Sequence, residues 1–144
     1  MQINPAREEK QIRLLSFFSC FKLGVGGPVY FLIDTGASRS LLSERDARIL
    51  GIDYGRLELQ KEPLVGLGGT LPVYKTPGEC SLTFRTSEQK GHVESFPHFD
   101  VVRVEIEDEK KRRLVFNLIP SLIGMDLLPR FKFYATRDVA YLER

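Results

Sequence analysis

Short apolar runs, separated by glycine, proline and charged residues, dominate the chain, and this pattern is typical of β-strands. Residues 14–23 and 29–33 are rich in aromatic and branched side chains, which pack well on a pleated sheet. A glycine–proline cluster at 24–28 stands between them. We therefore predict a hairpin of two strands that turns within this cluster.

One segment has the features of a helix instead. Ser43 can cap it, Glu44 and Asp46 fall in its first turn, and Gly51 follows its last residue. These are the usual start and stop signals of a helix. We therefore predict a helix over 43–50, and a second helical turn at 125–130.

The rest of the chain predicts short strands, with turn residues about every ten positions. The charged run at 105–113 is expected at a solvated hairpin tip. This regular spacing predicts an all-β protein, a small closed β-barrel-like fold with one or two short helices. The expected strands are 57–65, 71–75, 79–85, 92–94, 99–106, 114–119, 131–135 and 139–142.

The length of 144 residues is near the usual size of one domain. We expect a flexible N-terminal segment at 1–11 and a single domain at 12–144. The 21 basic and 19 acidic residues leave a net charge of +2, so neither nucleic acid nor an anionic membrane is an expected partner. Arg13, Lys22 and several glycines interrupt the apolar stretch at 12–33, which argues against a membrane span.

Two cysteines, Cys20 and Cys80, lie sixty positions apart, and the chain has no Cys-x-x-Cys. This favours two reduced thiols in a cytosolic protein over a disulfide framework, although a single bridge stays open. The N-terminus lacks the apolar core of a secretory signal. We expect a cytoplasmic location.

The candidate chemistry begins at Asp34, where an apolar strand ends abruptly in Asp-Thr-Gly. Gly36 allows the backbone to turn sharply beside the carboxylate. Taken alone, Asp34 is better explained as an aspartate that caps a strand-to-helix turn. Two further segments change this interpretation: a glycine-dense hairpin at 63–72, which suits a mobile flap, and a second apolar strand that runs into Gly124 and Asp126.

These three segments, in this order, resemble the retropepsins, the single-domain aspartic proteases of retroviral type. Residues 34–38 look like the catalytic Asp-Thr-Gly-Ala motif, residues 65–69 look like the flap tip, and residues 122–128 look like the later apolar-apolar-Gly-x-Asp-Leu-Leu segment. The resemblance extends from residue 17 to about residue 133.

The resemblance implies a homodimer, because the chain carries a single Asp-Thr-Gly. Asp34 from each subunit would share one proton and activate a water, Thr35 would cross-bond at the two-fold axis, and the Gly36 N–H would approach the carboxylate. Gly124 and Asp126 would support the loop. The substrate would lie against Ala37 and the flap residues Gly66, Leu67, Gly68 and Gly69.

The sequence also departs from the retroviral pattern. Retroviral enzymes usually have an aspartate after Asp-Thr-Gly-Ala and an arginine after the later glycine, and the two pair near the dimer interface. Here Ser38 and Met125 occupy these positions, so both charges are missing together. The chain is therefore nearer to cellular or prokaryotic relatives, and residues 131–142 are candidate dimerisation strands.

Other candidate sites are weaker. His92 and His98 have no Cys-x-x-Cys or Glu-x-x-His beside them, so no metal site is expected. The basic run at 110–113 directly follows acidic residues, which indicates a solvated tip more than a nucleic-acid surface. We therefore expect a cofactor-free aspartic endopeptidase that cleaves peptides or unfolded proteins. The alternative is a catalytically silent dimer that binds peptides or proteins.

Overall fold

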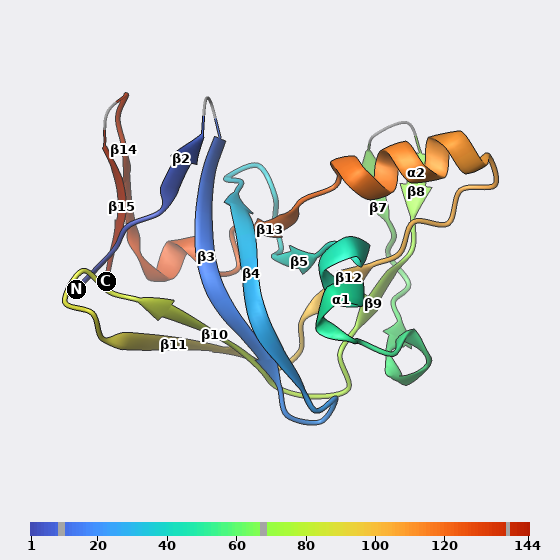
Figure 1. Cartoon of the computed structure of the whole chain (residues 1–144), viewed down its shortest axis with the longest axis horizontal. Coiled ribbons are helices and arrows are strands. Elements are labelled where there is room, and N and C mark those ends of the chain that lie inside the picture. Colours follow the sequence, from blue (N-terminus) through green and yellow to red (C-terminus); the bar gives the residue numbers. More distant parts are fainter. Residues whose placement is uncertain (9–10, 67–68, 138) are drawn as a thin grey trace.

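The computed structural model describes residues 1–8, 11–66, 69–137 and 139–144. Its architecture is mostly β (Figure 1). The large sheet has the order β11-β10-β3-β4-β13-β5-β12-β9-β6, with β2 also paired to β3. Its strands are β2 Ala6–Glu8, β3 Gln11–Cys20, β4 Val25–Ile33, β5 Leu41–Leu42, β6 Glu58–Leu59, β9 Val73–Lys75, β10 Cys80–Arg85, β11 Gly91–Phe96, β12 Asp100–Val102 and β13 Ser121–Ile123.

In the described part of the chain, two smaller sheets and four helical segments complete the fold. One small sheet has the order β1-β15-β14, and the other is the β7–β8 hairpin. The remaining elements are β1 Gln2–Ile3, β7 Leu64–Gly66, β8 Gly69–Leu71, β14 Lys132–Ala135, β15 Ala140–Glu143, α1 Glu44–Leu50, α2 Glu109–Leu118 and the 3-10 helices η1 Tyr54–Arg56 and η2 Leu128–Arg130. The expected all-β class with short helices is confirmed. Among the described residues, no helix is long and apolar enough to cross a membrane.

Helix α1 forms where its capping signals predict it. The side chain of Ser43 accepts a hydrogen bond from the Asp46 N–H, and Gly51 ends the helix in a left-handed conformation, with φ of 82°. Ala47 is fully buried. The helix therefore packs against the sheet beside β4 and β12.

The first hairpin forms as predicted, but its turn comes earlier in the chain than expected. β3 and β4 pair from Cys20 opposite Val25 to Arg13 opposite Leu32, so the turn lies at 21–24 and includes only Gly24 of the glycine–proline cluster. Gly24 takes a φ of 66°, which only glycine adopts without strain. The other cluster residues continue β4.

The strand predicted at 114–119 was wrong: residues 114–118 are helical, and Ile119 is the C-cap of the helix. Asp108 caps α2 by accepting a hydrogen bond from the Lys110 N–H. Val115 and Ile119, four residues apart, are buried together. The apolar run therefore has one buried stripe at helical spacing, which supplies the packing that the helix needs.

The core is a continuous cluster of aromatic and aliphatic side chains inside the curved sheet. Phe99 lies at its centre, with edge contacts to the rings of Phe18, Phe31 and Phe96. Cys20 and Cys80 are opposite each other on β3 and β10, buried and not bonded. Burial raises the pKa of the Cys80 thiol to about 12, so it stays protonated.

The N-terminal residues, expected to lie ahead of the domain, supply strands to two sheets. β1 pairs with β15 and β2 pairs with β3, and Ile3 is only 1% exposed. The chain ends therefore meet in one small sheet, visible at the left of Figure 1.

This terminal sheet is anchored by Glu94, a buried carboxylate on β11. Its Oε1 accepts hydrogen bonds from His92 at 2.8 Å and Arg144 at 2.7 Å, and its Oε2 accepts one from Arg130 at 3.0 Å. Burial alone would raise the pKa of Glu94, but the hydrogen bonds from His92 and Arg130 and the charge of Arg144 outweigh burial and lower the pKa.

Candidate active site

Asp34 begins the candidate site at the point where two parallel strands end. β4 ends at Ile33, which is opposite Ile123 of the parallel strand β13. The Asp34 N–H donates to the Ile123 carbonyl at 2.9 Å, so the aspartate is fixed by the sheet on its N-terminal side. Its side chain is half-buried.

The turn after Asp34 is closed on the aspartate itself. The Ala37 N–H donates to the Asp34 carbonyl at 3.2 Å, and the Gly36 N–H donates to Asp34 Oδ1 at 2.9 Å. A Cβ on Gly36 would lie only 3.2 Å from the same carboxylate oxygen. The glycine thus allows the close approach of the backbone to the carboxylate, and Thr35 is left exposed.

The far end of this loop is held by Asp126. Its Oδ1 accepts a hydrogen bond from Ser40 Oγ at 2.6 Å, and its Oδ2 accepts one from the Ser40 N–H at 2.9 Å. Ser40 Oγ also accepts from the Gly124 N–H at 3.0 Å, and the Met125 N–H donates to the Ala37 carbonyl at 2.8 Å. Residues 124–126 thus fix the loop at 34–40 from one side.

Gly124 has no room for a side chain. A Cβ built on it would lie 2.6 Å from the Ala37 carbonyl oxygen and 2.8 Å from the Arg39 carbonyl oxygen. Real Cβ atoms do not approach backbone oxygens so closely. The segment with Gly124 and Asp126, expected to support the site, therefore packs directly under the candidate catalytic loop.

Arg39 is a residue of this loop that the sequence reasoning missed. Its guanidinium, about half-exposed, contacts Asp100 Oδ1 at 3.0 Å and Gln60 Oε1 at 3.3 Å, and it lies 2.9 Å from His98 Nε2. Gln60 Nε2 also donates to Asp100 Oδ1 at 2.6 Å. Burial raises the pKa of Asp100, only partly offset by the Gln60 hydrogen bond and the Arg39 charge. These partners come from β12, the segment just before it and the segment after β6, which no local pattern around Arg39 indicates.

The candidate flap contains an antiparallel β-hairpin, as expected. β7 and β8 pair from Leu64 opposite Leu71 to Gly66 opposite Gly69, while Leu67 and Gly68 lie outside the described residues. Leu71 belongs to the same buried cluster as Val115 of α2 and Ile119, the residue after it. In Figure 1 this hairpin and the end of β4 both lie on the upper side of the molecule. Among the described residues, no hydrogen bond joins the hairpin to the loop at Asp34.

The remaining sequence candidates lie apart from Asp34 or have other partners. His92 belongs to the Glu94 cluster and His98 contacts Arg39. In the part of the chain that the structure describes, no three His, Cys, Asp or Glu side chains group where a metal could bind. Ser38 and Met125, which replace a charged pair of the retroviral pattern, are both exposed.

Comparison with known proteins agrees with this geometry. The aspartyl protease family model matches residues 21–127, most of the chain. A retropepsin-like aspartic protease from Rickettsia conorii superposes with a TM-score of 0.56 at 24% identity, over 99% of this chain and 88% of that chain. The EIAV protease, solved with the inhibitor HBY-793, superposes with a TM-score of 0.50 at 17% identity, over 87% and 91% of the two chains. No curated protein matches the chain significantly in sequence.

Proposed function

Because the chain belongs to the retropepsin-like aspartyl protease family, we propose that it is an aspartic endopeptidase that acts as a homodimer. Each subunit supplies one Asp34 to a shared site. The substrates are peptides or unfolded proteins in an extended conformation.

The observation that carries this proposal is the fixed position of Asp34. The Gly36 N–H on Oδ1 and the Asp34 N–H on the Ile123 carbonyl orient the carboxylate before any substrate binds. Such preorganisation is what acid–base catalysis needs. The chain has a single Asp-Thr-Gly, so the second carboxylate comes from a second copy. A two-fold axis through the site makes the interface isologous.

In this mechanism the two Asp34 carboxylates share one proton, because two carboxylates in contact do not both ionise. The ionised carboxylate takes a proton from a water as that water attacks the peptide carbonyl. The protonated carboxyl donates its proton to the carbonyl oxygen. The β7–β8 hairpin closes over the extended substrate and excludes bulk water.

A second candidate function keeps the same fold and dimer but no cleavage. The exposed Ser38 and Met125 lack the charges that pair in retroviral enzymes, so the two loops could meet in another arrangement. Incubation with an unfolded protein at acidic pH, with and without a statine-type transition-state mimic, separates the two functions. Inhibitable cleavage supports the peptidase, whereas peptide binding without cleavage supports the binding module.

The dimer requirement predicts that specific activity falls on dilution. Only the dimer has two Asp34 residues in one site, so the rate should depend on the square of concentration below the dimer dissociation constant. In the Thr35→Ala variant, specific activity should begin to fall at a higher protein concentration, since the variant lacks the hydroxyl proposed to form a hydrogen bond across the two-fold axis. Activity and sedimentation measured over the same dilution series provide the test, and a fully active monomer would contradict the prediction.

The absence of a hydroxyl at residue 37 leads to a prediction about the pH dependence of cleavage. Ala37 has no hydroxyl to donate to the neighbouring carboxylate, and a donor favours the ionised form of a carboxyl group. Ala37→Ser should therefore move the acidic limb of the pH–rate profile to lower pH. Both limbs describe the pair of aspartates and not either one alone. An acidic limb that stays in place, or moves to higher pH, in an intact dimer would refute this role of Ala37.

A further inference from the structure

The pairing of β3 with neighbouring strands is interrupted along its outer edge. On this edge β2 pairs with β3 only as far as Ala6 opposite Arg13, and β10 begins to pair at Thr83 opposite Phe17. Among the described residues, 14–16 have no strand partner on this side. In Figure 1, β10 runs away from β3 toward the N-terminus, while β2 joins β3 higher up.

This interruption opens into a cleft of about 840 Å³, a volume within the usual range of ligand sites. One wall is β3, and the opposite wall includes Asn4 and the turn at 86–91. That turn is fixed, because the Ser87 N–H donates to the Gln2 carbonyl at 2.9 Å and the Thr86 N–H donates to the Lys90 carbonyl at 2.8 Å. Hydrogen-bonded backbone, that of β3 and that of the turn at 86–91, therefore forms both walls of the cleft.

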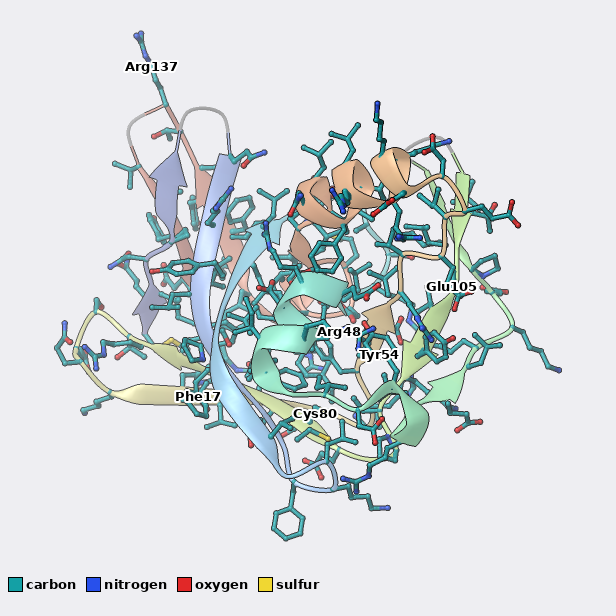
Figure 2. All side chains as sticks on the ribbon, turned by 45° about the vertical axis from the view of Figure 1, so that its right-hand side comes forward. Phe17, Arg48, Tyr54, Cys80, Glu105 and Arg137 are labelled. Atoms are coloured by element: carbon teal, nitrogen blue, oxygen red, sulfur yellow. The ribbon has the colours of Figure 1, made fainter. Side chains whose placement is uncertain are left out.

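The outer face of the sheet beside the cleft is apolar and uncovered. Leu15, Phe17 and Tyr30 are 48%, 50% and 56% exposed, and all three line the cleft. Leu15 is opposite Tyr30 on the neighbouring strand, so their side chains form one surface. Figure 2 labels Phe17, on β3.

The charged side chains that line the cleft are cations. They are Arg85 and Lys90, and no carboxylate is among the described lining residues. Arg85 makes no ion pair with any described residue, whereas Lys90 Nζ lies 3.7 Å from Glu88 with both side chains exposed. The cleft is therefore complementary to a ligand with negative charge.

Ser16 is a further unusual feature of the wall. It is 2% exposed, lines the cleft, and its Oγ has no hydrogen-bond partner among the described residues. Its neighbours on the same face of β3 are Leu14 and Phe18, which belong to the core. An unpaired hydroxyl is costly at such a position, and this one lies where the sheet lacks a neighbouring strand.

We propose that this cleft binds an extended peptide segment that carries apolar side chains and a carboxylate on one face. The peptide adds as a short strand to the open edge of β3 at 14–16, a known mode of peptide recognition. Its apolar side chains, two residues apart, face Leu15, Phe17 and Tyr30. A carboxylate on the same face pairs with Arg85, which shares a sheet face with Phe17 because Thr83, two residues earlier, is opposite Phe17. An extended peptide is preferred to a free fatty acid because only a peptide satisfies the open backbone edge.

The cleft is separate from the proposed catalytic site. β3 pairs with one edge of β4, while the strand that supports Asp34, β13, pairs with the other. A bound segment therefore leaves the loop at 34–40 uncovered. The proposal concerns binding alone and stands whether or not the protein cleaves peptides.

The test uses the full chain with Asp34→Asn, so that the protein does not cleave the peptide used as the probe. The probe is a blocked heptapeptide in which two valines and one glutamate alternate with serines, and the matched control peptide has lysine for glutamate. On titration, backbone amide shifts in 14–17 and 84–91 should move, and those in 34–37 should not. The lysine peptide should bind about tenfold more weakly or worse.

Two single substitutions, one inside the cleft and one far from it, test whether the peptide binds in the cleft. Arg85→Glu should weaken the glutamate peptide about tenfold or more, while Arg137→Glu, on the exposed tip between β14 and β15 (Figure 2), should change it less than twofold. The proposal is overturned if neither peptide binds, if both bind equally, or if the shifts centre on 34–37. It is also overturned if octanoate moves the cleft amides and the glutamate peptide does not.

Discussion

Replacing Asp34 by asparagine is expected to reduce peptide cleavage by at least about 10²–10⁴-fold, the usual contribution of acid–base catalysis. The amide has nearly the same size and can still accept the hydrogen bond from the Gly36 N–H, which the carboxylate accepts at 2.9 Å. It cannot share a proton with the second subunit or take one from water. Fold and assembly should therefore survive while the chemistry is lost.

Asp108→Asn is the matched control for this variant. Asp108 caps α2 through its carboxylate, and asparagine caps helices about as well, so the same charge is lost far from the proposed chemistry. Activity and the free energy of unfolding should both stay near the parent values. A purified Asp34→Asn protein that cleaves as fast as the parent would refute the proposed role of Asp34.

Gly124→Ala is expected to destabilise the protein by about 3 kcal/mol or more and to abolish activity with it. The added methyl group meets the carbonyl oxygens of Ala37 and Arg39 at 2.6 and 2.8 Å, and backbone atoms cannot turn away as a side chain can. The loop must move, and the hydrogen bond between the Met125 N–H and the Ala37 carbonyl would stretch or break. Denaturant unfolding and the cleavage assay measure the two effects.

Gly91→Ala provides the comparison, because a Cβ there lies an ordinary 3.6 Å from Thr83 Cγ2. Its free energy of unfolding should stay within about 1 kcal/mol of the parent. If Gly124→Ala were equally harmless, the tight packing beneath the loop at 34–40 would not be needed for stability.

The core of the candidate site was readable from the sequence because its signals are local. An apolar run that ends in Asp-Thr-Gly, and a second that ends in Gly124 and Asp126, each describe a strand followed by a sharp turn. The structure brings these two segments together through the parallel pairing of β4 and β13. Which strands would be neighbours, however, came from the family resemblance and not from the residues.

Helix α2 shows where the pattern was ambiguous. The apolar residues at 114–119 fit a short buried strand as well as one turn and a half of helix, and length alone does not decide between them. The charged run before them predicts a hairpin tip. Residues 109–113 of that run instead form the first turns of the helix, which begins after the cap at Asp108.

Arg39 and the terminal sheet show a different limit. The partners of Arg39 are 21 to 61 positions away in the chain, and β1 pairs with β15 across almost the whole sequence. No periodicity or turn signal within a short window encodes such contacts, because tertiary packing selects them. The sequence therefore predicted the elements of the site better than their surroundings.

The central claim is that one site requires Asp34 from two copies of the chain, and subunit mixing tests it most directly. Wild-type protein at fixed concentration is mixed with about a ninefold excess of Asp34→Asn subunits and allowed to exchange before cleavage is measured. If subunits reassort at random, about one in ten wild-type subunits keeps a wild-type partner. Activity should therefore fall to about a tenth of its starting value. Activity that stays unchanged after exchange has been verified by mass-labelled subunits would mean that one chain carries a complete site, and would contradict the account.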